Sequence, residues 1–121
     1  MWEFLKNLLG GKVVLEVELN PGLDPPVIIS NRDLTAEGKK IRWKRNDDVH
    51  DFEFKRLNDL DQAYFNEQSI DLDRQKVKCN NRAPDNTDAF EYEIIVRWDD
   101  NDYSSTKSGS PPDGKPVIRN Q

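Results

Sequence analysis

Hydrophobic and polar residues alternate most clearly between Ala89 and Trp98. Large apolar residues occupy every second position of this segment: Phe90, Tyr92, Ile94, Val96 and Trp98. Glutamate and arginine fill most of the positions between them. Successive side chains of a strand point to opposite faces, so the alternation predicts a strand with one buried face and one largely wetted face. The β-branched and aromatic content favours a strand over a helix.

The same alternation recurs in shorter segments along the chain. It predicts strands over Lys12–Leu19, Val27–Ile29, Lys40–Arg45, Val49–Leu57 and Arg74–Asn81, with short ones from Tyr103 and at Pro116–Ile118. Turn residues separate these segments, and about seven such strands are typical of a two-sheet antiparallel β-sandwich. We expect a single all-β domain over residues 1–121, with a core built from Leu15, Trp43, Phe52, Phe54, Tyr92, Ile94 and Val96.

Three parts of the chain depart from the strand pattern. Trp2, Leu5 and Leu9 share a helical face before Gly10, which predicts a short N-terminal helical turn covering one end of the sandwich. An amphipathic anchor is the alternative for that segment. The stretch Asn58–Asp73 predicts a short helix followed by an extended piece. Pro116 lacks an N–H group, so we expect the last strand to lie at a sheet edge.

Composition limits the function classes. Hydrophobic residues make up 35% of the 121 residues and charged residues 34%, which indicates a thin core with wetted outer faces. The net charge of −5 argues against nucleic acid as a general partner. No run approaches the roughly 20 apolar residues of a membrane span, so no membrane association is expected. One cysteine, Cys79, excludes an intramolecular disulfide, and no leader pattern precedes the strands, so we predict a cytoplasmic location.

Two segments are similar to parts of the immunoglobulin-like β-sandwich superfamily. The run D-A-F-E-Y-E-I from Asp88 to Ile94 resembles the tyrosine corner of strand F, and I-R-W-K from Ile41 to Lys44 resembles strand C with its core tryptophan. The resemblance implies an immunoglobulin-like topology in which the Tyr92 hydroxyl bonds to backbone upstream. Ile94 would hold the buried position of the antibody cysteine. A shared fold implies no activity.

A fainter resemblance concerns small bacterial sandwich proteins of the DP-EP type. It is carried by L-D-P-P-V-I from Leu23 to Ile28 and by P-V-I-R-N from Pro116 to Asn120. That group has no established activity, so the resemblance implies a bacterial β-sandwich and no site residues.

Two acidic clusters are candidates for metal binding. One holds Asp47, Asp48 and the only histidine, His50; the other holds Asp99, Asp100 and Asp102. Loop carboxylates suit calcium, and the clusters would form one site if their loops met at the same end of the sandwich. The second run lacks the glycine and distal glutamate of an EF-hand, and the chain lacks a second histidine for blue copper. Solvated turns account for the same residues, so we predict no metal, cofactor or catalytic residue.

Cysteine chemistry is not expected either. Cys79 alternates with Val77 and should point inward, whereas Lys76 and Lys78 should point outward. A nucleophilic thiol needs an electropositive neighbour on its own face, so we expect Cys79 to behave as a small buried hydrophobe.

The outward positions carry charges of one sign per strand. Lys40, Arg42 and Lys44 form one basic row and Arg74, Lys76 and Lys78 a second, whereas Glu16 with Glu18 and Glu91 with Glu93 are acidic. If Lys40–Lys44 lies beside Ala89–Trp98, the opposite charges neutralise one another across the ladder. The alternative is a docking face for an acidic protein partner, formed by Lys40, Arg42 and Lys44.

No combination of nucleophile, base and orienting group emerges from the sequence. The leading hypothesis is therefore a non-enzymatic binding or interaction module. One alternative is a calcium-type metal-binding module that uses the Asp-rich loops, and another is an enzyme built on scattered carboxylates. The sequence does not define the oligomeric state.

Overall fold

The protein is an all-β chain arranged in several sheets. The computed structural model describes residues 12–36, 40–83, 89–109 and 114–120, and these ranges hold eleven strands and no helix. The strands are β1 (Lys12–Leu19), β2 (Val27–Ile29), β3 (Asp33–Ala36), β4 (Lys40–Arg45), β5 (Glu53–Asn58), β6 (Phe65–Asp71), β7 (Lys76–Asn81), β8 (Phe90–Glu91), β9 (Glu93–Trp98), β10 (Asn101–Ser104) and β11 (Val117–Asn120). The helical turn predicted before Gly10 lies outside the described residues.

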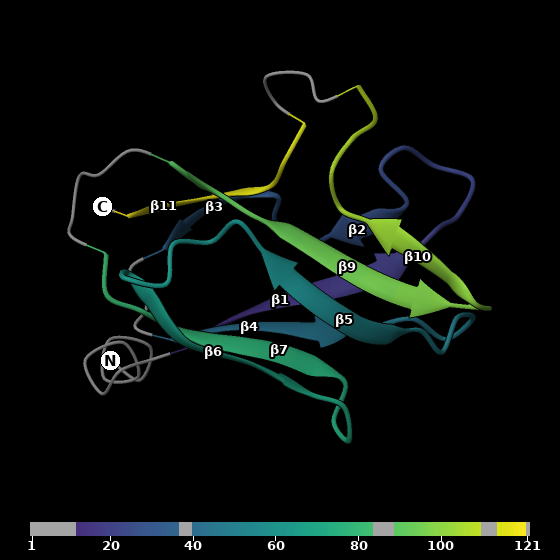
Figure 1. Cartoon of the computed structure of the whole chain (residues 1–121), viewed down its shortest axis with the longest axis horizontal. Helices are drawn as coiled ribbons and strands as arrows, with labels where there is room; N and C mark the ends of the chain where they lie inside the picture. Colours follow the sequence, from purple (N-terminus) through teal and green to yellow (C-terminus); the bar gives the residue numbers. More distant parts are fainter. Residues whose placement is uncertain (1–11, 37–39, 84–88, 110–113, 121) are drawn as a thin grey trace, which may run out of the picture.

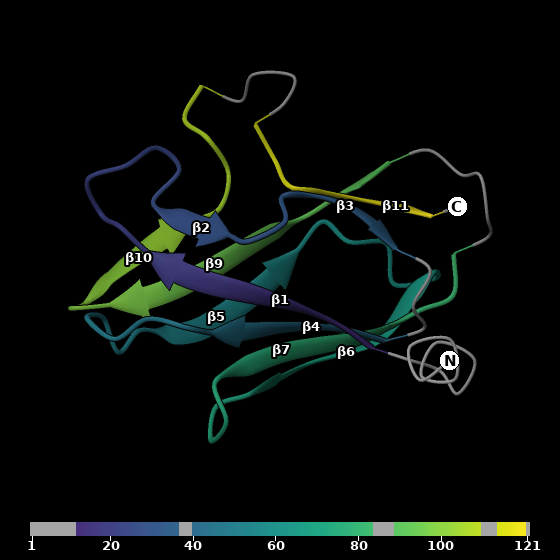
Figure 2. The same ribbon diagram turned by 180° about the vertical axis from the view of Figure 1, so that it is seen from behind.

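The strands form one large sheet and two small ones (Figures 1 and 2). The large sheet has five strands in the order β2-β1-β4-β7-β6, and the small sheets have the orders β10-β9-β5 and β3-β11-β8. Buried residues from all three sheets belong to a single hydrophobic cluster. This arrangement, in which sheets share one core, is consistent with the predicted β-sandwich.

The pairing is mixed, whereas the alternating pattern predicts an antiparallel sandwich. Strand β1 pairs with β4 in parallel, and β3 pairs with β11 in parallel. The prediction that Pro116–Ile118 forms an edge strand was wrong, because β11 lies between β3 and β8. Pro116 precedes the strand, so its missing N–H interrupts no ladder, and Val117 N–H donates to Arg32 O at 2.8 Å.

The predicted helix after Asn58 is also wrong, because a turn and an edge strand occupy this region. Asp61 closes the turn: its carboxylate accepts from Ala63 N–H at 2.9 Å, and its carbonyl accepts from Phe65 N–H at 2.8 Å. Asp side chains compete with helix formation in this way. Strand β6 follows directly and carries an irregularity at Glu67, whose φ is 55°.

The alternating segment from Ala89 to Trp98 joins the two small sheets. It divides at Tyr92 into β8, which pairs with β11, and β9, which pairs with β5 and β10. Tyr92 N–H donates to Pro116 O at 3.0 Å at the point where the chain passes from one sheet to the other. The segment is therefore extended, as predicted, but its two strands belong to different sheets.

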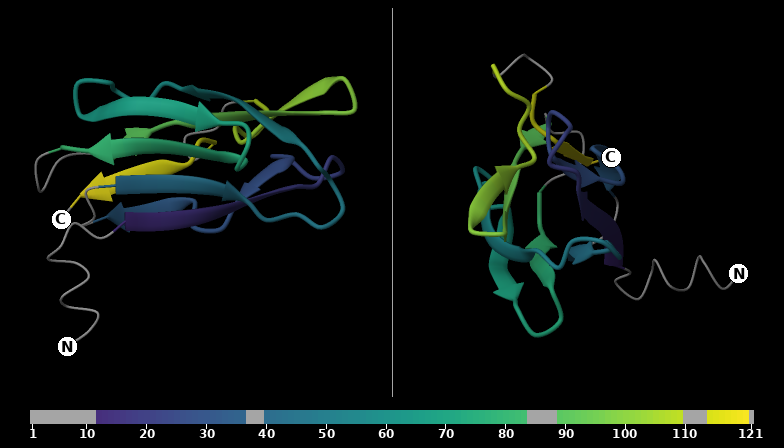
Figure 3. Two further views of the ribbon diagram at one scale, coloured as in Figure 1. Left: turned by 90° about the horizontal axis from the view of Figure 1, so that it is seen from below. Right: turned by 90° about the vertical axis from the view of Figure 1, so that its right-hand side faces the viewer.

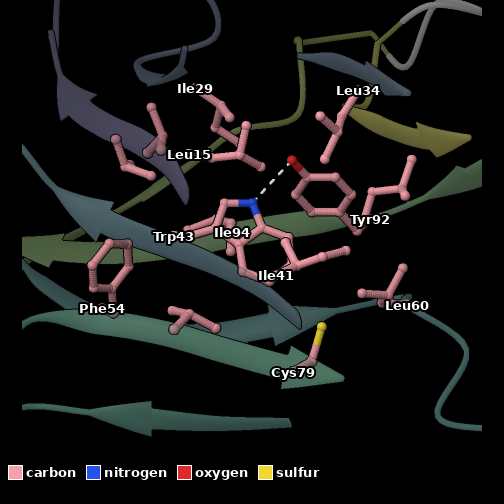
Figure 4. Close-up of a cluster of buried hydrophobic side chains, with 14 of the residues drawn as sticks. Leu15, Ile29, Leu34, Ile41, Trp43, Phe54, Leu60, Cys79, Tyr92 and Ile94 are labelled. Carbon is pink, nitrogen blue, oxygen red and sulfur yellow. Dashed lines mark hydrogen bonds between the residues drawn. The ribbon is translucent and has the colours of Figure 1, made fainter. Parts of the chain in front are cut away.

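The predicted core is confirmed. Each predicted core residue has 2% or less of its surface exposed: Leu15, Trp43, Phe52, Phe54, Tyr92, Ile94 and Val96. At the centre, Trp43 Nε1 donates to the Tyr92 hydroxyl at 3.0 Å (Figure 4). The resemblance had implied that this hydroxyl bonds to backbone, but the structure gives it the indole N–H of Trp43 instead.

Candidate functional site

The two basic rows found in the sequence lie on neighbouring strands. Strand β4 pairs with β7, which places Arg42 opposite Lys78 and Lys44 opposite Lys76. The prediction that Ala89–Trp98 neutralises the row on β4 is wrong, because β4 and β9 belong to different sheets. Cations therefore face cations along the centre of the five-stranded sheet.

The register orders the outward side chains into rows that cross β1, β4, β7 and β6, and the left view of Figure 3 shows these strands. The first row is Lys12, Lys40, Asn80 and Asn66; the second is Val14, Arg42, Lys78 and Ser69; the third is Glu16, Lys44, Lys76 and Asp71. Among the paired residues, acidic side chains appear only in the third row, and Glu67, in the irregular part of β6, accepts a hydrogen bond from Asn80 of the first row. We name as the basic face the outward cations Lys12, Lys40, Arg42, Lys44, Lys76 and Lys78.

Among the described residues, the cations of the basic face have no salt-bridge partners. Within the described ranges, none of them comes within 4.0 Å of a carboxylate oxygen. Several cations on the small sheets and their loops are paired, although Arg56 and Lys107 have no carboxylate within 4.0 Å in the described ranges. Lys55 lies 3.3 Å from Asp102, and Lys115 lies 2.9 Å from Asp59. The basic face thus keeps its charges available to a partner.

Two residues show how closely these charges are packed. The Arg42 guanidinium donates through Nη1 to Cys79 O at 3.2 Å and to Ile41 O at 3.0 Å, which holds it against the sheet. Loss of solvation and then the charges of Arg74 and Lys78 lower the pKa of Lys76, although Asp71 acts in the opposite direction. At Lys76, loss of solvation and the neighbouring cations together outweigh the effect of Asp71.

Lys12 and Lys78 belong to this surface but were not among the predicted partner-binding residues. The sequence places Lys78 in a basic row, but it does not indicate that the strand next to this row is β4. Lys12 lies next to Lys40 only because β1 and β4 pair in parallel. Alternation predicts the face on which a side chain lies, whereas the adjacent strand depends on long-range pairing.

The first acidic cluster anchors a loop. Asp47 accepts from the N–H groups of Leu19 at 2.9 Å, Val49 at 2.9 Å and His50 at 2.8 Å. Its Oδ2 also lies 3.1 Å from His50 Nδ1. Burial opposes ionisation, but these hydrogen bonds outweigh it and lower the pKa of Asp47 to about 2. Both carboxylate oxygens are thus engaged by the protein itself.

The second acidic cluster forms a hairpin turn. Asp99 and Asp100 have φ angles of 50° and 64° and connect Trp98 to its partner Asn101. Left-handed backbone at both central residues is typical of a type I′ turn, which tolerates aspartate. Asp102 lies 3.3 Å from Lys55 Nζ and 3.7 Å from an Arg97 nitrogen.

The two acidic clusters do lie at the same end of the molecule. The His50 ring packs edge-on against Trp98, with 4.7 Å between ring centroids, beside the hairpin turn. In the described part of the chain, however, no group of three or more His, Cys, Asp or Glu side chains is placed to hold a metal ion. Asp48 is exposed in the intervening loop.

A shallow hollow lies beside His50. It has a volume of about 260 Å³ and is lined in part by Glu18, Pro21, Val49 and His50. Ligand pockets are usually about 300–1,000 Å³ and largely enclosed. A smaller hollow of about 110 Å³ adjoins it along β1 and β2 and shares Glu18 and Ile28.

Cys79 points into the core, as predicted. Its side chain is 1% exposed, and burial raises the pKa of the thiol to about 12, with a smaller opposing effect from Arg42. The thiol is therefore protonated at neutral pH.

No protein-family model matches this chain, and no curated protein matches it. Among the described residues, no helix has the length and apolar character required to cross a membrane. The basic face is the most distinctive feature of the described surface.

Proposed function

We propose that the protein is a non-enzymatic interaction module that binds an acidic protein partner through the basic face. The observation that carries this proposal is the direct opposition of Arg42 to Lys78 and of Lys44 to Lys76 in a chain with a net charge of −5. Like charges directly opposite in a ladder are destabilising. A partner that supplies carboxylates relieves this repulsion on binding.

The distribution of charge supports the proposal. Four cations elsewhere, Lys55, Arg97, Lys115 and Arg119, have acidic partners, whereas in the described ranges those of the basic face have none. A patch of one sign raises the association rate with an oppositely charged partner and excludes like-charged ones. Lys40, Arg42 and Lys44, expected from the sequence, are joined there by Lys12, Lys76 and Lys78.

The environment of the reactive side chains supports a non-enzymatic role. The thiol of Cys79 is buried, His50 and Asp47 bond to each other in a loop anchor, and the hollow beside them is shallow. A free buried cysteine also supports the cytoplasmic location that we propose.

The immunoglobulin-like type remains part of the proposal. It is supported by the burial of Trp43 and Tyr92 in one core. In that superfamily the strands that carry these residues share a sheet, whereas here they come from different sheets.

Binding of poly-glutamate tests the function. The variant Lys12→Gln/Lys40→Gln/Lys78→Gln should bind about tenfold less tightly than the unmodified protein. This estimate takes the loss of binding free energy as a few tenths of a kcal/mol, in order of magnitude, for each charge removed. The control Lys55→Gln/Arg56→Gln/Lys107→Gln makes the same change in net charge at exposed residues outside the basic face. It should bind within about twofold of the unmodified protein. Equal losses in both variants, or no binding by the unmodified protein, would contradict the proposal.

A further inference from the structure

We infer that the acidic partner binds the basic face as an extended segment with carboxylates at every second residue, lying along β4 and β7. This inference rests on the proposed function and adds the conformation and charge pattern of the partner. It is drawn from the spacing of the cations, the polar character of the outward residues and the position of the nearest acids.

The spacing of the cations matches an extended chain. Outward residues of one strand, such as Lys40 and Arg42, are separated by two residues, or about 6.6–6.8 Å. Carboxylates at alternate positions of an extended peptide repeat at the same distance, so successive acids keep in step with successive rows. Acids on one face of a helix recur about every 5.4 Å, so they match the spacing of successive rows less closely.

The outward residues of the three rows offer little apolar surface to a helix. A helix usually docks by laying apolar side chains into a hydrophobic groove. Of the outward residues in the three rows, Val14 is the only large apolar one, and it is 48% exposed. The rows contain no aromatic side chain on which a nucleic-acid base could stack. An extended acidic peptide is therefore the occupant that the chemistry favours.

The rows also define where the segment binds most strongly. Lys12, Lys40, Arg42 and Lys78 occupy the first and second rows, in which no paired residue is acidic. The nearest carboxylate, that of Glu67 in the irregular part of β6, accepts a hydrogen bond from the Asn80 amide of the first row. In the third row Glu16 neighbours Lys44, and Asp71 neighbours Lys76. These acids repel an incoming carboxylate, so the third row should contribute least. Arg42, already held by two backbone carbonyls, provides an ordered anchor in the centre.

Two fluorescent peptides of identical composition test the charge pattern. One alternates glutamate and threonine over eight residues, and the other carries four consecutive glutamates followed by four threonines. In an extended conformation the alternating peptide presents all its carboxylates on one side, whereas the block peptide presents half of them. Fluorescence anisotropy should give about fivefold tighter binding of the alternating peptide, with both affinities falling as salt increases.

Paired variants test the location within the face. Lys40→Gln/Lys78→Gln should lower the affinity for the alternating peptide about fivefold, and Lys44→Gln/Lys76→Gln should lower it less than about twofold. Both variants remove the same number of charges, and each replaces one cation on β4 and one on β7. Equal effects of the two variants would overturn the row assignment.

The outcomes separate this inference from the proposed function. If both peptides bind equally and Lys40→Gln/Lys78→Gln weakens both, the acidic-partner function stands and the extended pattern is wrong. If an eight-nucleotide oligothymidylate binds more tightly than either peptide, a nucleic acid replaces the acidic protein and both are overturned. If neither peptide nor poly-glutamate binds, the proposed function itself fails.

Discussion

Trp43 and Tyr92 join the two layers of the protein through one hydrogen bond at the centre of the core. The indole Nε1 donates to the tyrosine hydroxyl at 3.0 Å, and the ring centroids are 5.2 Å apart. Both side chains are 0% exposed. Trp43 comes from the five-stranded sheet, whereas Tyr92 lies between β8 and β9 of the small sheets. The contact therefore links sheets that share no ladder hydrogen bonds at this point.

Tyr92→Phe removes the hydroxyl that accepts the hydrogen bond from Trp43, and the buried indole N–H of Trp43 loses this acceptor. We expect the free energy of unfolding to fall by about 1–3 kcal/mol, the usual cost of an unsatisfied buried polar group. Urea denaturation followed by circular dichroism measures this change. Tyr64→Phe is the control, because Tyr64 is 38% exposed and should change stability by less than about 0.5 kcal/mol. Equal stability of Tyr92→Phe and the unmodified protein would show that the hydrogen bond makes no net contribution.

The alternating pattern was enough to predict which side chains are buried but not which strands are neighbours. The prediction that Leu15, Trp43 and Val96 lie in the core is confirmed. The alternation of side chains between the two faces of a strand depends only on neighbouring residues in the sequence. The side-by-side position of Lys12 and Lys40 depends on a parallel pair between distant segments. Pro116 was misjudged for a related reason, since its effect depends on whether it lies inside the ladder or before it. The outward orientation of the lysines in the basic face can be predicted from the sequence. The strand pairing that places these lysines side by side cannot.

Asp47 should make stability depend on pH in the acid range. Its pKa is lowered to about 2, because the hydrogen bonds from Leu19, His50 and Val49 outweigh the opposing effect of burial. A depressed carboxyl pKa stabilises the folded state above the unfolded value near 4, and this stabilisation is lost as pH falls towards 2. The contribution at neutral pH is on the order of 2 kcal/mol.

Thermal unfolding between pH 2 and 7 tests this assignment. Asp47→Asn should be less stable at pH 7 and should lose less stability than the unmodified protein between pH 4 and 2. Asp48→Asn, in the same loop but exposed, is the control and should retain the full pH dependence. An unchanged pH profile in Asp47→Asn would assign the acid sensitivity to other carboxyl groups.

Cys79 should be protected from thiol reagents in the folded protein. Its side chain is 1% exposed, and burial raises its pKa to about 12, so thiolate is scarce at pH 8. Labelling with an aromatic disulfide reagent should proceed at the rate at which the protein opens, and it should be complete within minutes in 6–8 M urea. Rapid labelling without denaturant would place the thiol at the surface, contrary to the structure.

The β9–β10 hairpin offers a stabilising substitution. Asp100 has a φ of 64° and a side chain that is 99% exposed, at 4.0 Å from Arg97. Glycine adopts a positive φ without steric cost, so Asp100→Gly should raise stability by about 0.5–1 kcal/mol. The ion pair lost with Asp100 contributes little at such exposure. Asp48→Gly, where φ is not positive, should not stabilise the protein when both variants are compared by thermal denaturation.

Lys78 connects stability with the proposed function. It lies directly opposite Arg42 and has no carboxylate partner in the described ranges, so Lys78→Gln removes a repulsion without breaking an ion pair. At low salt we expect the variant to be about 0.2–1 kcal/mol more stable and to bind poly-glutamate less tightly. The gain in stability should shrink in 1 M salt, where charges are screened within about 3 Å.

The matched control for Lys78 is Lys55→Gln, which removes a cation whose Nζ lies 3.3 Å from Asp102. That variant should show no gain in stability and no loss of binding, because its charge is already paired and lies outside the basic face. If the basic face is a binding surface with internal charge repulsion, Lys78→Gln should gain stability and lose binding. Lys55→Gln should show neither change. A Lys78→Gln variant that is destabilised at low salt would mean that Lys78 stabilises the sheet, and the opposed cations would then no longer support a binding role.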